Sequence, residues 1–245
     1  MKKFLITIQY LGKNYNGFQK QNTGVLTIEG VIEDALKKLT GEDITIFASG
    51  RTDAGVSAYA QTAHFESETT IPFNKLPFAL NELLPDDIKI IDCKQVESDF
   101  HARFNVKKKT YIYKMYFSPF MLPLLEQGAY WLKKQPNIKL MKQCAKKLEG
   151  KHNFKCFMSS GGQSKTYERI IYYIDIQQSG NEITVEVCGN GFLYNMVRII
   201  VGTLIEVGYG KKSLQDVLMA LERQDRTMAG YLVPAKGLYL KSVKY

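Results

Sequence analysis

A strand followed by a helix occurs twice along this chain of 245 residues, and that order restricts the fold more than any single motif. Residues 4–10 alternate apolar and polar side chains, as a half-buried strand does, and residues 28–39 have helical spacing. The order restarts with an alternating strand at 110–117 and a helix at 137–148. Both helices end in similar segments, Lys-Lys-Leu-Thr-Gly and Lys-Lys-Leu-Glu-Gly. We therefore predict two halves of similar organisation.

The other predicted strands and helices do not alternate regularly along the chain. They are strands at 44–48, 88–92, 170–177, 183–188 and 238–243, and helices at 74–84 and 192–207, with one more beginning at Ser213 in a capping box with Asp216. Gly180 and Asn181 are predicted to give the hairpin loop its positive φ angles. Hairpins and runs of strands favour an α+β fold over a doubly wound parallel sheet. We predict domains at 1–105, carrying an Arg-Thr-Asp loop, and at 106–245.

The charge and cysteine content exclude several classes of protein. The chain has 33 Lys and Arg against 24 Asp and Glu, a formal net charge of +9. Its four cysteines form no Cys-x-x-Cys pair, and its three histidines are not spaced as ligands, so we predict neither a disulfide scaffold nor a metal site. The cysteines are expected to be buried in a reducing compartment.

Two segments resemble membrane signals and fail as such. The first eleven residues imitate a signal peptide, but Thr7 and Gln9 interrupt the apolar stretch and no small-residue cleavage site follows. Residues 192–205 are too few to span a bilayer and contain Arg198. We expect a cytoplasmic protein with no membrane partner.

Clustered cations and tyrosines suggest a nucleic-acid partner. Lys107, Lys108 and Lys109 precede a tyrosine-rich strand, and three lysines repeat at helical spacing within 139–146. Ammonium groups suit phosphates and aromatic rings suit unstacked bases. The same residues also fit a solvated helix face and cross-strand tyrosine pairs, so both interpretations stay open.

The segment Gly50-Arg51-Thr52-Asp53-Ala54-Gly55 follows a predicted strand. Two glycines permit a tight turn, and a strand end is a rigid support for a reactive carboxylate such as that of Asp53. Asp and Gly are also ordinary turn formers, which is the alternative.

Arg198 is the only formal charge within 192–205, a helix expected to be largely buried. A guanidinium stays charged and needs acceptors at low dielectric, and the nearest acidic residue in that direction, Glu206, is two turns away. Asp53 is a candidate partner. The alternatives are that Arg198 extends to the surface or binds a phosphate.

Five blocks in this order resemble the TruA family of tRNA pseudouridine synthases. They are Gly50–Val56, Phe100–Phe104, Lys109–Tyr113, Asn190–Arg198 and Gly237–Leu240, and together they extend over nearly the whole chain. The resemblance implies two ferredoxin-like α+β halves about a pseudo-twofold axis. In such proteins the halves share a continuous mixed sheet, with helices on one side and a basic cleft.

The resemblance also implies an activity and site residues. It implies isomerisation of uridine to pseudouridine in structured RNA, without metal or organic cofactor, by a homodimer that acts on tRNA. Carried over, Asp53 is the essential aspartate, Tyr111 stacks on the flipped base, Arg198 pairs with Asp53, and Arg51 assists flipping or holds the backbone. The further substrate-binding residues that we predict are Arg103, Lys107, Lys108, Lys109 and Leu238.

Two segments depart from the family pattern and leave the target open. Ser57 stands where a histidine is usual, and Ala229–Ala235 replaces a commoner Gly-Pro-Thr-Ala-Pro-Ala segment. The anticodon stem-loop is the expected target, with another tRNA arm or ribosomal RNA as alternatives. Two other classes remain: an RNA-binding relative without catalysis, and a metabolite enzyme that uses Asp53.

Overall fold

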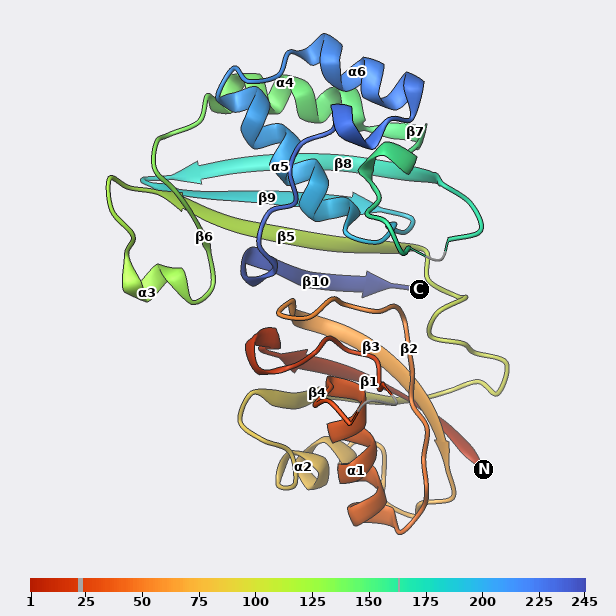
Figure 1. Ribbon diagram of the computed structural model, residues 1–245. Helices are drawn as coiled ribbons and strands as arrows, with labels where there is room; N and C mark the ends of the chain where they lie inside the picture. Colours follow the sequence, from red (N-terminus) through yellow and green to blue (C-terminus); the bar gives the residue numbers. More distant parts are fainter. Residues whose placement is uncertain (22–23, 163) are drawn as a thin grey trace. The chain divides into compact units, whose positions relative to one another are not determined.

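A computed structural model describes residues 1–21, 24–162 and 164–245 (Figure 1). The chain forms two compact units, residues 1–107 with 239–245 and residues 108–238. The division that the sequence predicts, after residue 105, assigns 239–245 to the second half instead. That division into domains stays a prediction.

The first unit contains a mixed sheet and two helices. Its elements are β1 (Lys2–Tyr10), α1 (Ile28–Thr40), β2 (Phe47–Ala48), β3 (Ser57–Ser67), α2 (Leu76–Asn81), β4 (Ile88–Val96) and β10 (Leu238–Lys244). The strands lie in the order β4-β1-β3-β10, and β2 pairs with β3. β1 runs antiparallel to both neighbours, whereas β10 runs parallel to β3.

The alternation of apolar and polar residues accounts for the buried face of β1, and capping residues account for where α1 begins and ends. Phe4, Ile6 and Ile8 are buried in the core, as the period of two predicts. α1 begins where the Thr27 hydroxyl accepts the Gly30 N–H, and it ends at Gly41 in the left-handed region, with φ +78°. The predicted strand at 44–48 is confirmed only at Phe47–Ala48.

The second unit has an antiparallel sheet with a short parallel addition. Its elements are β5 (Lys108–Phe117), α3 (Pro123–Glu126), β6 (Tyr130–Leu132), α4 (Ile138–Leu148), β7 (Gly150–Asn153), β8 (Glu168–Ser179), β9 (Glu182–Gly189), α5 (Met196–Gly208) and α6 (Leu214–Arg223). The strand order is β5-β9-β8-β7, and β6 runs parallel to β5. α4 packs against α5 and β8.

Helix α5 is the buried helix that its sequence predicts, but it starts later. All residues from Ile199 to Ile205 are buried. The predicted start at residue 192 was wrong, because Asn195 takes a left-handed conformation with φ +62° and the helix begins at Met196. The capping box of Ser213 and Asp216 is present at α6. In the β8–β9 turn Gly180 has φ +57°, whereas Asn181 does not have the positive φ predicted for it.

The mixed α+β class is confirmed by these elements. The pseudo-twofold axis, the shared continuous sheet and the basic cleft stay predictions. Among the described residues, no helix has both the length and the apolar character needed to cross a bilayer.

Candidate active site

Hydrogen bonds from three other segments of the first unit hold the loop that carries Asp53. The Thr52 hydroxyl lies 2.7 Å from the Tyr10 hydroxyl of β1, and the Thr52 carbonyl accepts the Phe18 N–H. Gln61 of β3 accepts the Ser49 hydroxyl and donates to the Gly50 carbonyl. The turn closes where Val56 N–H donates to the Asp53 carbonyl at 3.1 Å. The backbone of the loop that carries Asp53 is therefore held in place.

Close packing at Gly17 adds to this support. Gly17 has φ +89°, and a Cβ there would lie 2.9 Å from the Thr52 carbonyl oxygen. Only glycine allows the chain to pass so near the loop. The side chain of Asp53 is half-buried, and that of Arg51 is exposed.

Arg198 is held from two directions within the second unit. Its Nε donates to the Val233 carbonyl at 2.8 Å, and its Nη1 donates to Asn195 Oδ1 at 2.8 Å. The Asn195 side-chain amide also donates to the Ser159 hydroxyl at 3.0 Å. The guanidinium, half-buried at the start of a buried helix, is thus fixed in orientation.

One of the segments that depart from the family pattern contacts Arg198, and the other lies just after the Asp53 loop. Val233, in the C-terminal departure, supplies the carbonyl to Arg198. Gly230 donates its N–H to the Thr203 hydroxyl on α5, which packs this segment onto the helix. The Ser57 hydroxyl accepts the Gly12 N–H at 3.0 Å, just after the Asp53 loop. The C-terminal departure therefore helps to hold Arg198.

Tyr111 lies on β5 opposite Val187 of β9. Its half-buried ring meets Phe192 edge to face, with centroids 5.3 Å apart. Such a contact fixes the plane of the ring. Two positions along the strand, Tyr113 is fully buried and donates its hydroxyl to the Pro234 carbonyl, and burial raises the pKa of Tyr113.

The other predicted binding residues divide between exposed and buried positions. Arg103, Lys107 and Lys108 are exposed, Lys109 is half-buried, and Leu238 is buried. Asp53, Arg51, Arg103 and Lys107 belong to the first unit, whereas Tyr111, Arg198, Lys108, Lys109 and Leu238 belong to the second. The pairing of Asp53 with Arg198 stays a prediction.

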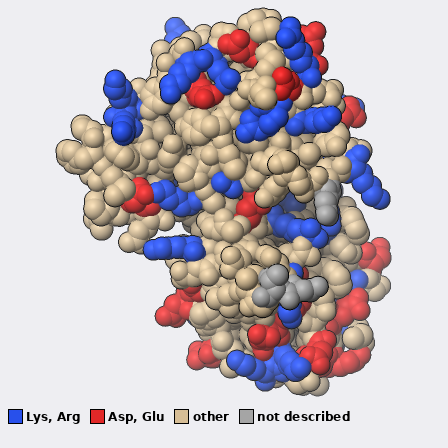
Figure 2. Space-filling view, in the orientation of Figure 1, with Lys and Arg blue, Asp and Glu red and all other residues tan. Residues whose placement is uncertain are grey.

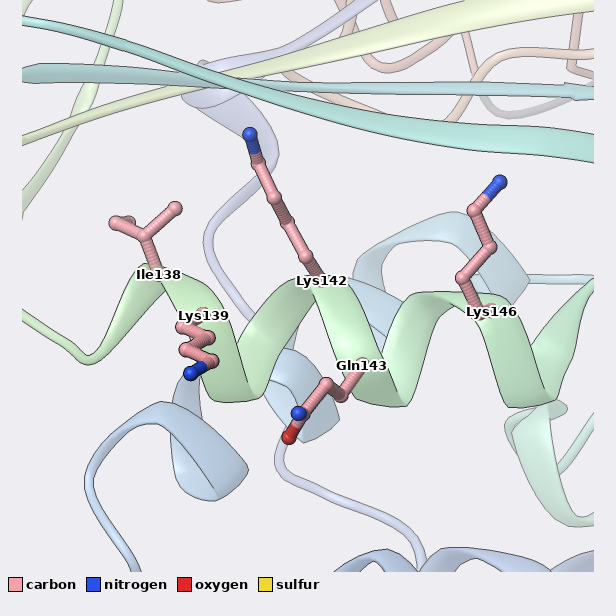
Figure 3. Close-up of a pocket in the computed structure, with 5 residues that line it drawn as sticks. All are labelled: Ile138, Lys139, Lys142, Gln143 and Lys146. Carbon is pink, nitrogen blue, oxygen red and sulfur yellow. The ribbon is translucent and has the colours of Figure 1, made fainter.

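The lysines of α4 line a shallow, open part of the surface (Figure 3). Lys139, Lys142 and Lys146 form it with Ile138 and Gln143. Lys146 pairs with Glu149 at 2.9 Å, while Met141, Cys144, Ala145 and Leu148 are the buried residues of this helix. The helix is amphipathic, so its cations are presented to solvent.

The positive charge is unevenly distributed between the units. Residues 1–107 with 239–245 hold 14 basic and 14 acidic side chains, whereas residues 108–238 hold 19 basic and 10 acidic ones. The second unit therefore carries the whole formal charge of +9. Figure 2 shows lysines and arginines over the part of this unit that bears α4 and α6, with acidic residues between them.

Sequence reasoning missed Asn195 and Gln61. Asn195 falls inside the helix predicted from residue 192, which hid its role as the residue before α5. Asn tolerates the left-handed region better than most residues, and that was the available signal. Gln61 lies in β3, where the sequence suggested a strand only at His64 and gave no bounds for it.

The cysteines are buried and free, as expected. His64 is buried, and its Nδ1 accepts the Ala102 N–H at 3.1 Å. Within the described ranges, His, Cys, Asp and Glu side chains nowhere form a group of three or more that could hold a metal ion.

Comparison with known proteins gives matches over the whole chain. The family described as tRNA pseudouridine synthase matches residues 6–105 and 144–245. A protein named tRNA pseudouridine synthase A, from Thermoanaerobacter sp. strain X514, is 42% identical over 245 residues and is covered completely, as is this chain. Proteins named tRNA pseudouridine synthase A 2 are 43% identical in Clostridium tetani, over 98% of this chain and 97% of that protein, and 44% identical in Clostridium perfringens, over the full length of both. The resemblance to the TruA family is thereby confirmed, and this chain belongs to the tRNA pseudouridine synthase family of isomerases.

Proposed function

We propose that this protein converts specific uridines of tRNA to pseudouridine, with Asp53 as the essential residue and without a cofactor. The observation that carries the proposal is the Asp53 loop. Half-buried Asp53 lies in a loop between β2 and β3 that Tyr10, Phe18 and Gln61 hold through Thr52 and Gly50. The chain is also 42% identical over 245 residues to a protein named tRNA pseudouridine synthase A.

The reaction needs few chemical groups. The bond between N1 of uracil and C1′ of ribose breaks, the detached base turns, C5 bonds to C1′, and C5 loses its proton, which N1 regains overall. A carboxylate can begin this by attacking the sugar or the base, or by taking the C2′ proton. Each route requires an ionised Asp53.

Arg198 serves that requirement in this proposal. An arginine near a carboxylate favours its charged form. Since Nε and Nη1 of Arg198 donate to Val233 and Asn195, we propose that Nη2 donates to the Asp53 carboxylate. Tyr111, fixed by Phe192, offers a flat surface for the flipped base. Arg51, Arg103, Lys107, Lys108, Lys109 and Leu238 hold the surrounding RNA.

The anticodon stem-loop is the proposed target, and the protein is proposed to act as a cytoplasmic homodimer. Another tRNA arm or ribosomal RNA is the alternative, because Ser57 and the 229–235 segment differ from the usual pattern. The four free cysteines fit a reducing compartment. Mapping pseudouridine in total RNA with and without the gene identifies the target.

Release of tritium from tRNA transcribed with 5-tritiated uridine tests the reaction. The wild-type protein is expected to release label, and Asp53→Asn is expected to lose at least about 1,000-fold in rate, since a neutral amide can neither attack nor accept a proton. Asp43→Asn is the matched control, because Asp43 is exposed and pairs with Lys37. Wild-type protein that binds tRNA but releases no label would identify a catalytically inactive relative. If the wild-type protein neither binds tRNA nor releases label, the alternative of a metabolite enzyme that uses Asp53 is favoured.

Arg198→Met tests the proposed pairing. This variant is expected to fold, because an apolar side chain suits a buried helix, and to lose turnover. Full activity in Arg198→Met would contradict the role assigned to the guanidinium.

A further inference from the structure

Four rings of the first unit form a contiguous group that we call the ring cluster: Phe47, His64, His101 and Phe104. His64 is buried and stacks on Phe47, with centroids 5.2 Å apart and an interplanar angle of 23°. His101 meets His64 at 4.6 Å, and Phe104 lies on His101 at 4.2 Å with an angle of 31°. The cluster thus runs from the core to the surface.

Its outer end is exposed. Phe104 is 77% exposed and Phe47 is 50% exposed. Because His101 covers one face of the Phe104 ring, most of this exposure belongs to the opposite face and the edges. Arg103, also exposed, is the adjacent residue. Phe104 therefore presents an exposed aromatic face beside a cation.

The turn that presents Phe104 is held in place by hydrogen bonds. The N–H groups of Phe104 and Asn105 donate to the His101 carbonyl, and the His101 N–H donates to Asn105 Oδ1 at 2.6 Å. His101 Nδ1 accepts the Arg103 N–H at 3.1 Å.

The core fixes the same turn from beneath. The Ala102 N–H donates to His64, and the Ala102 carbonyl accepts the Tyr245 hydroxyl at 3.0 Å. The exposed ring is therefore preorganised rather than left on a loose loop.

We propose that the ring cluster is a second base-binding site, in which Phe104 stacks on an unstacked nucleobase of the RNA and Arg103 contacts a neighbouring phosphate. The inference rests on the proposed function for the identity of the ligand. A free aromatic face next to a guanidinium matches a base joined to a phosphate. The first unit has no formal net charge, so we expect it to bind RNA mainly through contacts with bases. The second unit, which carries the net positive charge, attracts the phosphate backbone of the RNA.

Variants of Phe104 test the proposal through affinity for a tRNA transcript, measured by filter binding at several salt concentrations. Phe104→Ala is expected to weaken binding about tenfold, the scale of one lost base–aromatic stack. The slope of log affinity against log salt is expected to stay unchanged, because no charge is removed. Arg103→Gln is expected to reduce that slope by about one.

Two further substitutions separate stacking from apolar contact. Phe104→Trp keeps an aromatic face and is expected to bind as tightly as wild type, whereas Phe104→Leu is expected to bind as weakly as the alanine variant. Phe78→Ala is the matched control, since Phe78 of α2 is 71% exposed and also lies near a lysine, Lys75. Its affinity should equal that of the wild type.

The competing occupant is a second copy of this chain, and sedimentation of each variant detects it. Unchanged affinity in Phe104→Ala, full recovery by Phe104→Leu, or weakened binding that follows loss of a dimer would each overturn the proposal. Tritium release by the wild type tests the proposed function independently of the proposed base-binding site. If the wild type releases label and Phe104→Ala binds normally, the base site is wrong while the proposed function stands.

Discussion

Arg198 depends on residues that are distant in the sequence or easily overlooked. Val233 contributes only its carbonyl, and Asn195 contributes a side chain from a left-handed backbone position. A lone charge in an apolar run was visible in the sequence, whereas its hydrogen-bond partners depended on how two loops pack on α5. The residue was therefore predictable, and its orientation was not.

Replacing Asn195 by glycine tests whether this orientation matters. Glycine keeps the left-handed backbone but removes the Oδ1 acceptor from Arg198, so we expect normal folding with turnover reduced about tenfold. Ser159→Ala removes only the other partner of the Asn195 amide and should retain activity. Single-turnover tritium release measures both. Equal losses in the two variants would show that Asn195 acts on the local fold rather than on Arg198.

His64 makes stability sensitive to acid. Burial, then the neighbouring His101 and Lys3, lowers the pKa of His64 from 6.5 to about 4. The unfolded chain takes up this proton below pH 6.5 while the folded chain does not, so stability is lost as pH falls from 6.5 toward 4. The loss reaches at most about 3 kcal/mol.

Urea unfolding of wild type and His64→Asn at pH 7.5 and pH 5 measures this effect. Asparagine cannot titrate, and its Oδ1 can accept the Ala102 N–H, so the variant should lose less stability on acidification. An identical pH dependence in both proteins would assign the effect to other groups.

Among the elements, periodicity was reliable where one face is buried. α1 and α4 follow their apolar spacing, and β8 and β9 were placed within two residues at each end. The extent of β3 was not predicted, although His64 was expected in a strand. Most residues of β3 are buried and its buried side chains include Gln61, Thr62 and His64, so neither alternation nor an apolar run marks its bounds. These polar groups are satisfied by partners such as Ser49 and Ala102, which the sequence alone does not identify.

The packing of α5 on residues 229–233 can be tested at Gly202. A Cβ on Gly202 would lie 1.9 Å from the Tyr231 carbonyl oxygen. Alanine usually stabilises a helix interior relative to glycine, but here we expect a loss of more than about 2 kcal/mol from overpacking. Gly30→Ala in α1 is the comparison, since its Cβ would meet the Thr27 hydroxyl at 3.2 Å and the flexible Lys20 side chain at 3.9 Å, and no backbone atom. Urea denaturation measures both, and a stable Gly202→Ala protein would contradict this packing.

At the scale of the whole molecule, the concentration of charge in residues 108–238 predicts which lysines control salt dependence. Replacing Lys139, Lys142 and Lys146 of α4 together by glutamine should reduce the magnitude of the salt slope of tRNA binding by about two to three. The matched triple variant of Lys38, Lys75 and Lys94 in the first unit should leave it nearly unchanged. Filter binding between 50 and 200 mM salt would distinguish them, and equal slopes would place the phosphates elsewhere.

The C-terminal strand gives the first unit an unusual order of assembly. β10 pairs in parallel with β3 through Tyr239 and Leu240, and Tyr245 reaches back to Thr62 and Ala102. Until residues 238–245 have been synthesised, the β3 edge lacks this partner and offers unpaired backbone groups to any other strand. Before residues 238–245 are made, both the Asp53-bearing sheet and the turn beneath Phe104 lack partners, so folding of the first unit waits on a segment more than 130 residues further along the chain.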